Sequence, residues 1–103
     1  MFDFSKIKIR KPKELRFASA GIPLSTPNKN TFEGIKHVRA LGLGGMELEF
    51  VHSVNLKPES AIEASKIAEE ADVTLTAHGS YYINLNSVEP QKVGASRQRI
   101  IDA

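Results

Sequence analysis

The stretches GMELEF, at residues 45–50, and VTLTAH, at residues 73–78, decide the fold class of this chain. Apolar and polar side chains alternate strictly in both of them, which is typical of a β-strand with one apolar face and one polar face. A third stretch, LRFASA at residues 15–20, is strand-like and is followed by Gly21, just as the stretch at 73–78 is followed by Gly79. The sequence therefore predicts three strands, spaced about 30 residues apart.

The segments that follow these strands predict helices. The first helix is expected to begin with Thr31 as its N-cap and to end before Gly42, and the second opens with Pro58 in its first turn. A third helix is predicted to begin near Glu89 and Pro90. Strands that alternate with helices in this way form parallel sheets, because right-handed helical crossovers connect them.

A parallel sheet with one apolar and one polar face predicts a barrel. In an open, doubly wound sheet, helices cover both faces and the strands are apolar on both sides. Here the polar side chains would point into the barrel; they are Glu47, Glu49, Thr74, Thr76 and His78. The same alternation places Arg16 inside, where it is expected to pair with Glu47. The predicted fold class is α/β: three βα units of a TIM (β/α)8 barrel, which is a partial barrel with parallel strands.

The length of the chain limits how much of a barrel is present. Eight such units need about 250 residues, whereas this sequence has 103. We expect residues 15–103 to be the N-terminal part of a TIM-barrel domain and residues 1–14 to be a basic leader. Residues 1–16 carry six bases and two acids, which is more typical of a solvated arm than of a nucleic-acid-binding segment. The first and third strands would be open edges, through which we expect the fragment to self-associate.

The composition excludes several classes of protein. The chain has no cysteine, which excludes disulfide frameworks, cysteine-ligated metals and thiol nucleophiles. It also lacks the GxGxxG and P-loop spacings that form a phosphate cradle. No apolar run is long enough to span a membrane, and the first residues do not resemble a signal peptide, so we expect a cytoplasmic protein with no membrane partner.

Histidine and carboxylate side chains are the candidates for chemistry, because functional groups gather at the carboxyl ends of parallel strands. His78 ends the third strand on its polar face, so it is a metal ligand, an acid–base group or a structural histidine. Glu49 lies near the same end of the second strand, where it is either a site residue or the ion-pair partner of a base. His52 is a site candidate or an exposed loop residue, and His37 falls on a helix surface.

The stretch HGSYYINLNS, at residues 78–87, resembles the segment after the third barrel strand in the endonuclease IV family of apurinic/apyrimidinic endonucleases. That family has the pattern His-x-x-Tyr-x-Ile-Asn-Leu at this place, followed by a helix with a Ser-Arg pair, as at Ser96 and Arg97 here. The run of Ala20 and Gly21 is a weaker similarity. The specific match covers about twenty residues.

The resemblance implies a TIM barrel that binds three zinc ions through His, Asp and Glu side chains at strand ends. In such an enzyme a metal-activated hydroxide attacks the phosphodiester 5′ to an abasic site in DNA. His78 matches a zinc ligand, with Glu49 and His52 as further candidate ligands. Tyr81 and Tyr82 match a loop that contacts the DNA. The remaining ligands would lie beyond residue 103, so the chain alone is expected to be inactive and its parent protein to be a DNA-repair hydrolase.

The sequence departs from the family pattern at residues 51–55, at Gly79 and at Tyr82, which affects DNA specificity more than the fold. Two other functions remain open. One is a sugar isomerase or epimerase of the related xylose isomerase-like barrels, in which Glu49 and His78 would act on a small polyol. The other is a non-catalytic barrel fragment that assembles with copies of itself.

Overall fold

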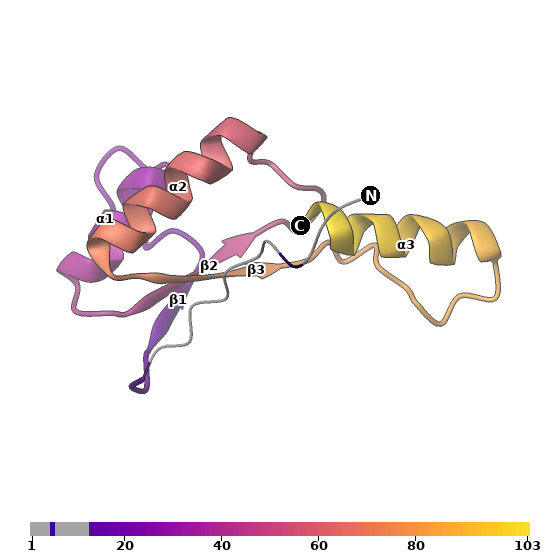
Figure 1. The fold of residues 1–103 in the computed structure, drawn as a ribbon, viewed down its shortest axis with the longest axis horizontal. Coiled ribbons are helices and arrows are strands. Elements are labelled where there is room, and N and C mark those ends of the chain that lie inside the picture. Colours follow the sequence, from indigo (N-terminus) through magenta and orange to yellow (C-terminus); the bar gives the residue numbers. More distant parts are fainter. Residues whose placement is uncertain (1–4, 6–12) are drawn as a thin grey trace.

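Three parallel strands and three helices alternate along the chain in the computed structural model, which describes Ser5 and residues 13–103. In chain order they are β1 (Ala18–Ala20), α1 (Thr31–Ala40), β2 (Gly45–Glu49), α2 (Pro58–Ala71), β3 (Thr74–His78) and α3 (Pro90–Asp102). The strand order in the sheet is β1-β2-β3, and both strand pairs are parallel (Figure 1). The predicted order of three βα units is confirmed, and most of the predicted leader lies outside the described residues.

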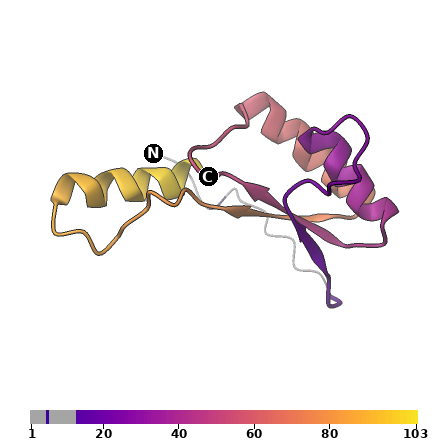
Figure 2. The ribbon, with the colours of Figure 1, turned by 180° about the vertical axis from the view of Figure 1, so that it is seen from behind.

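One face of the sheet is covered by helices. Both α1 and α2 lie on the same side of the strands, as two opposite views agree (Figures 1 and 2). Ile35 and Val38 of α1 form one buried cluster with Met46, the second residue of β2, and with Ala64 of α2. Within the described residues no helix lies over the opposite face, which we call the bare face.

The strand register places the predicted polar side chains on the bare face. Glu47 is the partner of Thr76, and Glu49 is the partner of His78. Partners in neighbouring strands point to the same side of a sheet, and alternate residues point to opposite sides. Because Met46 is buried beneath the helices, its neighbour Glu47 must point the other way. The assignment of the two faces from the sequence is therefore confirmed.

Two element boundaries differ from the prediction. β1 begins at Ala18 rather than at residue 15, because its pairing with β2 starts only at Gly45. Asn30, and not Thr31, is the N-cap of α1, since the Asn30 side chain accepts a hydrogen bond of 2.9 Å from the Glu33 backbone N–H. Asparagine is at least as good an N-cap as threonine, so the prediction of Thr31 as the N-cap was wrong by one residue.

The predicted ion pair between Arg16 and Glu47 is not formed. Ala20 is the register partner of Glu47, so Arg16 lies four residues, or about 13 Å, toward the other end of the strands. There its guanidinium pairs with the Asp72 carboxylate at 3.0 Å and donates a hydrogen bond of 2.6 Å to the Asp72 carbonyl. Arg39 approaches the same carboxylate at 3.5 Å. We call Arg16, Arg39 and Asp72 the amino-edge clamp.

The third helix, α3, lies beyond the carboxyl end of β3 and away from α1 and α2 (Figure 1). Ser96, which is 1% exposed, attaches it to the preceding loop. The Ser96 Oγ accepts a hydrogen bond of 2.9 Å from the Asn84 N–H and donates one of 3.3 Å to the Asn84 carbonyl. The serine of the Ser-Arg pair therefore has a structural role. In the part of the chain that the structure describes, no helix is both long and apolar enough to cross a membrane.

Candidate functional site

The carboxyl edge of the sheet brings His78 and Glu49 together. His78 is the last residue of β3, Glu49 is the last residue of β2, and the two are register partners. Their backbones are therefore about 4.8 Å apart, and both side chains lie on the bare face. An imidazole and a carboxylate stand side by side at the end of the strands where barrel enzymes hold their sites.

Glu49 has an environment that suits a bound cation. Its side chain lies against Gly21, where a Cβ atom would come within 3.2 Å of the Glu49 Cγ. One carboxylate oxygen, Oε1, is enclosed and has no hydrogen-bond partner among the described residues. The hydrogen-bonding contact with Glu47 raises the pKa of Glu49, desolvation and the Glu47 charge add to this, and His78 opposes it. An enclosed carboxylate oxygen without a partner is available to a positively charged ligand.

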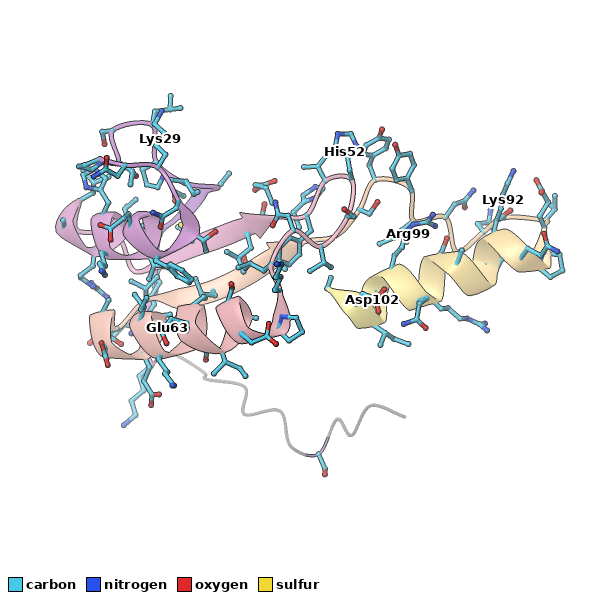
Figure 3. The ribbon with its side chains drawn as sticks, turned by 90° about the horizontal axis from the view of Figure 1, so that it is seen from above. Lys29, His52, Glu63, Lys92, Arg99 and Asp102 are labelled. Atoms are coloured by element: carbon cyan, nitrogen blue, oxygen red, sulfur yellow. The ribbon has the colours of Figure 1, made fainter. Side chains whose placement is uncertain are left out.

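These two side chains fit part of a zinc site. Imidazole nitrogen and carboxylate oxygen are both zinc donors in proteins. Within the described residues, however, no group of three or more His, Cys, Asp or Glu side chains is placed to hold a metal ion. His52, the third candidate ligand, is therefore not brought to His78 and Glu49, and it lies on the loop after β2 (Figure 3). A complete zinc site would need further ligands.

Buried Ser80 ties together the loops that follow β2 and β3. Its Oγ donates a hydrogen bond of 3.0 Å to the His52 carbonyl and accepts one of 3.2 Å from the Tyr82 N–H. The Tyr81 N–H donates another, of 3.0 Å, to the Val51 carbonyl. These bonds fix the backbone on which the aromatic side chains stand. The sequence analysis missed Ser80, because a single serine in a loop gives no signal of burial.

Three aromatic rings meet beyond His78. The ring centroids of Tyr81 and Tyr82 are 4.3 Å apart, and the Tyr81 hydroxyl donates a hydrogen bond of 3.0 Å to the Tyr82 hydroxyl, which raises the pKa of Tyr81. The His52 ring lies edge-on to Tyr81 at 5.3 Å. The tyrosines are 58% and 51% exposed. We call these three residues the aromatic cluster, and it presents accessible ring surface to a ligand.

Arg99 of α3 joins the aromatic cluster. Its guanidinium carbon lies 5.7 Å from the centroid of the Tyr82 ring, which is within cation–π distance (Figure 3). The sequence analysis missed this residue, because the resemblance singled out Arg97. Helical periodicity gives the one available signal: Arg99 lies three positions after buried Ser96 and so shares its side of α3, whereas Arg97 is exposed.

The remaining histidine, His37, belongs to a different region. It lies on α1, on the covered side of the sheet, and its Nε2 is 2.7 Å from the Ser25 hydroxyl. Nothing brings it to the carboxyl edge, in agreement with its assignment to a helix surface. His37 therefore offers a matched control for substitutions of His78.

Residues 35–103 match the xylose isomerase-like TIM barrel family. The matched region runs from within α1 through α3 and includes every candidate residue of the carboxyl edge. Because it covers more than half of the chain and agrees with the parallel βα architecture, this chain belongs to that family. The prediction of a partial TIM barrel is confirmed, and the family match does not distinguish endonuclease IV from other members.

A relative of the chain is the uncharacterized protein MJ0133 of Methanocaldococcus jannaschii. The two sequences are 41% identical over 87 residues, which is 84% of this chain and 30% of the relative. The chain thus spans less than a third of the length of the relative that it matches. No solved structure was found to be similar to this chain.

Proposed function

We propose that the carboxyl edge of this sheet is part of the active site of a zinc-dependent apurinic/apyrimidinic endonuclease similar to endonuclease IV. The proposal is carried by the pairing of His78 with Glu49 on the bare face, with exposed Tyr81 and Tyr82 immediately beyond them. The stretch that resembles that family, residues 78–87, supplies three of these four side chains. Family membership supports the proposal at the level of the fold.

In this proposal, His78 and Glu49 are metal ligands. A neutral imidazole nitrogen of His78 would bind the metal, and the enclosed Oε1 of Glu49 would gain the partner that it lacks. When bound, zinc supplies Lewis acidity and lowers the pKa of a coordinated water. His52 would have to leave the aromatic cluster to become a third ligand. The other ligands would come from residues beyond those described here.

Tyr81 and Tyr82 would contact DNA near the abasic site. A missing base leaves its neighbours partly unstacked, and stacking of a base on an aromatic side chain contributes about 1–3 kcal/mol. Both rings are exposed on the same edge as the proposed metal ligands. Contacts to unstacked bases would therefore position the strand beside His78. A cytoplasmic location remains part of this proposal.

Zinc titration of the 103-residue chain tests the role of His78. Zinc is titrated by calorimetry into the unaltered chain, into His78→Ala and into His37→Ala, which removes a histidine from α1. We expect His78→Ala to weaken zinc binding by at least about tenfold. Loss of a residue that only hydrogen-bonds to a metal ligand already weakens metal binding by about tenfold or more. His37→Ala should bind as the unaltered chain does. Equal affinity in all three proteins would contradict the proposal.

Cleavage activity needs a longer protein than this chain. A chimera can carry the chain in place of the 87 aligned residues of the Methanocaldococcus jannaschii relative. We expect it to cut a duplex 5′ to a tetrahydrofuran abasic analogue, and we expect a chelator or His78→Ala to abolish the cutting. A folded, zinc-loaded chimera that leaves this duplex intact, or that isomerises a sugar instead, would overturn the proposal.

The open sheet edges support a further proposal, that the isolated chain self-associates. Within the described residues, β1 and β3 each have a neighbouring strand on one side only. Unpaired backbone groups on an edge strand pair readily with a second strand. Light scattering over a range of concentrations should give masses above that of one chain. A monomer at every concentration would contradict self-association.

A further inference from the structure

Arg99 is a cation that has no carboxylate partner within the described residues. Four other basic side chains form ion pairs there; they are Arg16, Lys36, Arg39 and Lys92. Arg99 is half-buried, and its guanidinium lies over the Tyr82 ring at 5.7 Å. The ring contact positions the guanidinium without using its N–H groups, so Arg99 keeps hydrogen-bond donors for a ligand.

A cavity of about 210 Å³ opens beside Arg99 and the aromatic cluster. Its walls include His52 and Ser80 on the loop side, buried Phe50 as an apolar surface, and Arg99 and Asp102 on α3. Figure 3 labels His52, Arg99 and Asp102. One cation, one carboxylate, an apolar wall and the His52 ring thus surround one space. Of these groups, only His52 was a candidate metal ligand, and neither Arg99 nor Asp102 has a role in the proposed metal site.

This combination of groups suits a planar ring with donors and acceptors on its edge. A simple anion would be repelled by Asp102, whose carboxylate already accepts a hydrogen bond of 2.7 Å from Gln98. An apolar ligand would bury Arg99 and Asp102 without new hydrogen bonds, which is unfavourable. A nucleobase stacks through its face, and its edge accepts hydrogen bonds from Arg and donates them to Asp.

We propose that this cavity binds one unstacked nucleobase of a single-stranded DNA segment. The His52 ring stacks on the base, Arg99 donates to its edge, and Asp102 accepts from it. The inference rests on the proposed function, in which bases around an abasic site are unstacked. It adds to that function a base-binding site whose ligand-contacting side chains, on His52 and on α3, lie outside residues 78–87.

Tyrosine fluorescence reports on this site, because the Tyr81 ring contacts His52 and the Tyr82 ring contacts Arg99. The chain has two tyrosines, which are Tyr81 and Tyr82, and no tryptophan. A short single-stranded oligodeoxycytidylate should quench their emission, and a fluorescein-labelled copy gives the affinity by anisotropy. We expect Arg99→Gln and His52→Ala each to weaken binding about tenfold, within the range for one stacked base. Arg97→Gln removes the same charge from an exposed position of α3 and should weaken binding less than about twofold.

Equal losses in Arg99→Gln and Arg97→Gln would overturn the proposal, because general charge would then explain the binding. Competition by inorganic phosphate but not by deoxycytidine would also overturn it. Circular dichroism checks each variant, and if Arg99→Gln is unfolded, His52→Ala is compared with Arg97→Gln instead, with the same contrast expected. Zinc titration separates this inference from the proposed function: normal zinc binding without oligonucleotide binding rejects the base site alone.

Discussion

The amino and carboxyl edges of the sheet consist of the same three strands but differ in how their polar groups are satisfied. At the amino edge, Arg16 and Arg39 both bind Asp72, which ends α2 in the left-handed conformation with a φ of 57°. At the carboxyl edge, Glu49 has an enclosed oxygen without a partner among the described residues, and Tyr81 is more than half exposed. The charged groups of the amino edge therefore satisfy one another, although the Thr74 Oγ1 at that edge also has no partner among the described residues. At the carboxyl edge it is a charged group that is left unsatisfied.

This difference separates stability from binding. Barrel enzymes have their active sites at the carboxyl ends of the strands, whereas residues at the amino ends contribute mainly to stability. A polar group that is satisfied within the protein adds to the free energy of unfolding, while an unsatisfied group gains most from a ligand. Substitutions at the amino edge should therefore lower stability, and substitutions at the carboxyl edge should change binding with little loss of stability.

Substitutions of two glycines should give the largest difference in stability between the two edges. A Cβ at Gly45, at the amino edge, would lie 3.0 Å from the Ala18 Cβ and 3.2 Å from the Thr74 carbonyl, which are parts of the neighbouring strands. We expect Gly45→Ala to lower the free energy of unfolding by about 1–3 kcal/mol, the usual cost of overpacking. A Cβ at Gly79, at the carboxyl edge, would meet only the end of the Ile83 side chain, at 3.1 Å.

Because that side chain can rotate away, Gly79→Ala should change the free energy of unfolding by less than about 0.5 kcal/mol. Urea denaturation of the two variants and of the unaltered chain measures the difference. Similar losses of stability in both variants would remove the distinction between the two edges.

Asp72→Asn tests the amino-edge clamp with a smaller expected effect. Asparagine tolerates the left-handed conformation as aspartate does, so the substitution removes charge and leaves the backbone unstrained. The carboxylate is 52% exposed, and we expect a loss of about 0.5–1 kcal/mol, as for partly exposed ion pairs. Urea denaturation at low and high salt should show the loss shrinking as salt screens the pairs. Glu69→Gln, on exposed α2, is the control; an equal loss there would mean that the clamp adds nothing specific.

The faces of the sheet could be predicted from the sequence because alternation is a local property. The order of residues within one strand determines which side chains lie on the same face of the sheet. Met46 and Glu47, which are adjacent in β2, point to opposite faces. Helix starts at Pro58 and Pro90 are local in the same way, since proline favours the first turn.

The register between neighbouring strands is not a local property, and the wrong prediction for Arg16 follows from this. The alternation gave Arg16 the same parity as Glu47, but only the pairing of β1 with β2 shows that they lie in different rows. The predicted placement of His78 and Glu49 at the carboxyl edge was correct, because each residue is the last of its strand. Arg99 and Ser80 could not be found, because their roles depend on where α3 and the loops pack, which no short pattern encodes.

Glu49→Gln should leave the stability of the metal-free chain unchanged or slightly increase it at neutral pH. The contact with Glu47 raises the pKa of Glu49 in the folded chain, so the ionised carboxylate is less favourable there than in the unfolded chain. The stability that protonated Glu49 adds is therefore present at acid pH and lost as the pH rises through the folded-state pKa. Urea denaturation with a chelator should show the advantage of Glu49→Gln at neutral pH disappearing in acid. Glu63→Gln, on α2, is the control, and a clear loss of stability in Glu49→Gln would contradict the open character of this edge.

The smallest expected effect is on the Tyr81 hydroxyl. Donation of its proton to the Tyr82 hydroxyl raises the pKa of Tyr81, so Tyr82→Phe, which removes the acceptor, should lower that pKa toward its ordinary value. In the Tyr82→Phe variant Tyr81 is the one remaining tyrosine. Absorbance titration at alkaline pH therefore measures the ionisation of Tyr81 alone. His52→Ala leaves the hydroxyl pair intact and should keep the pKa raised. An unchanged pKa in Tyr82→Phe would mean that the two hydroxyls are apart in solution. Because Tyr82→Phe keeps the ring that Arg99 covers, oligonucleotide affinity should change little, which separates the hydroxyl contact from the ring contact.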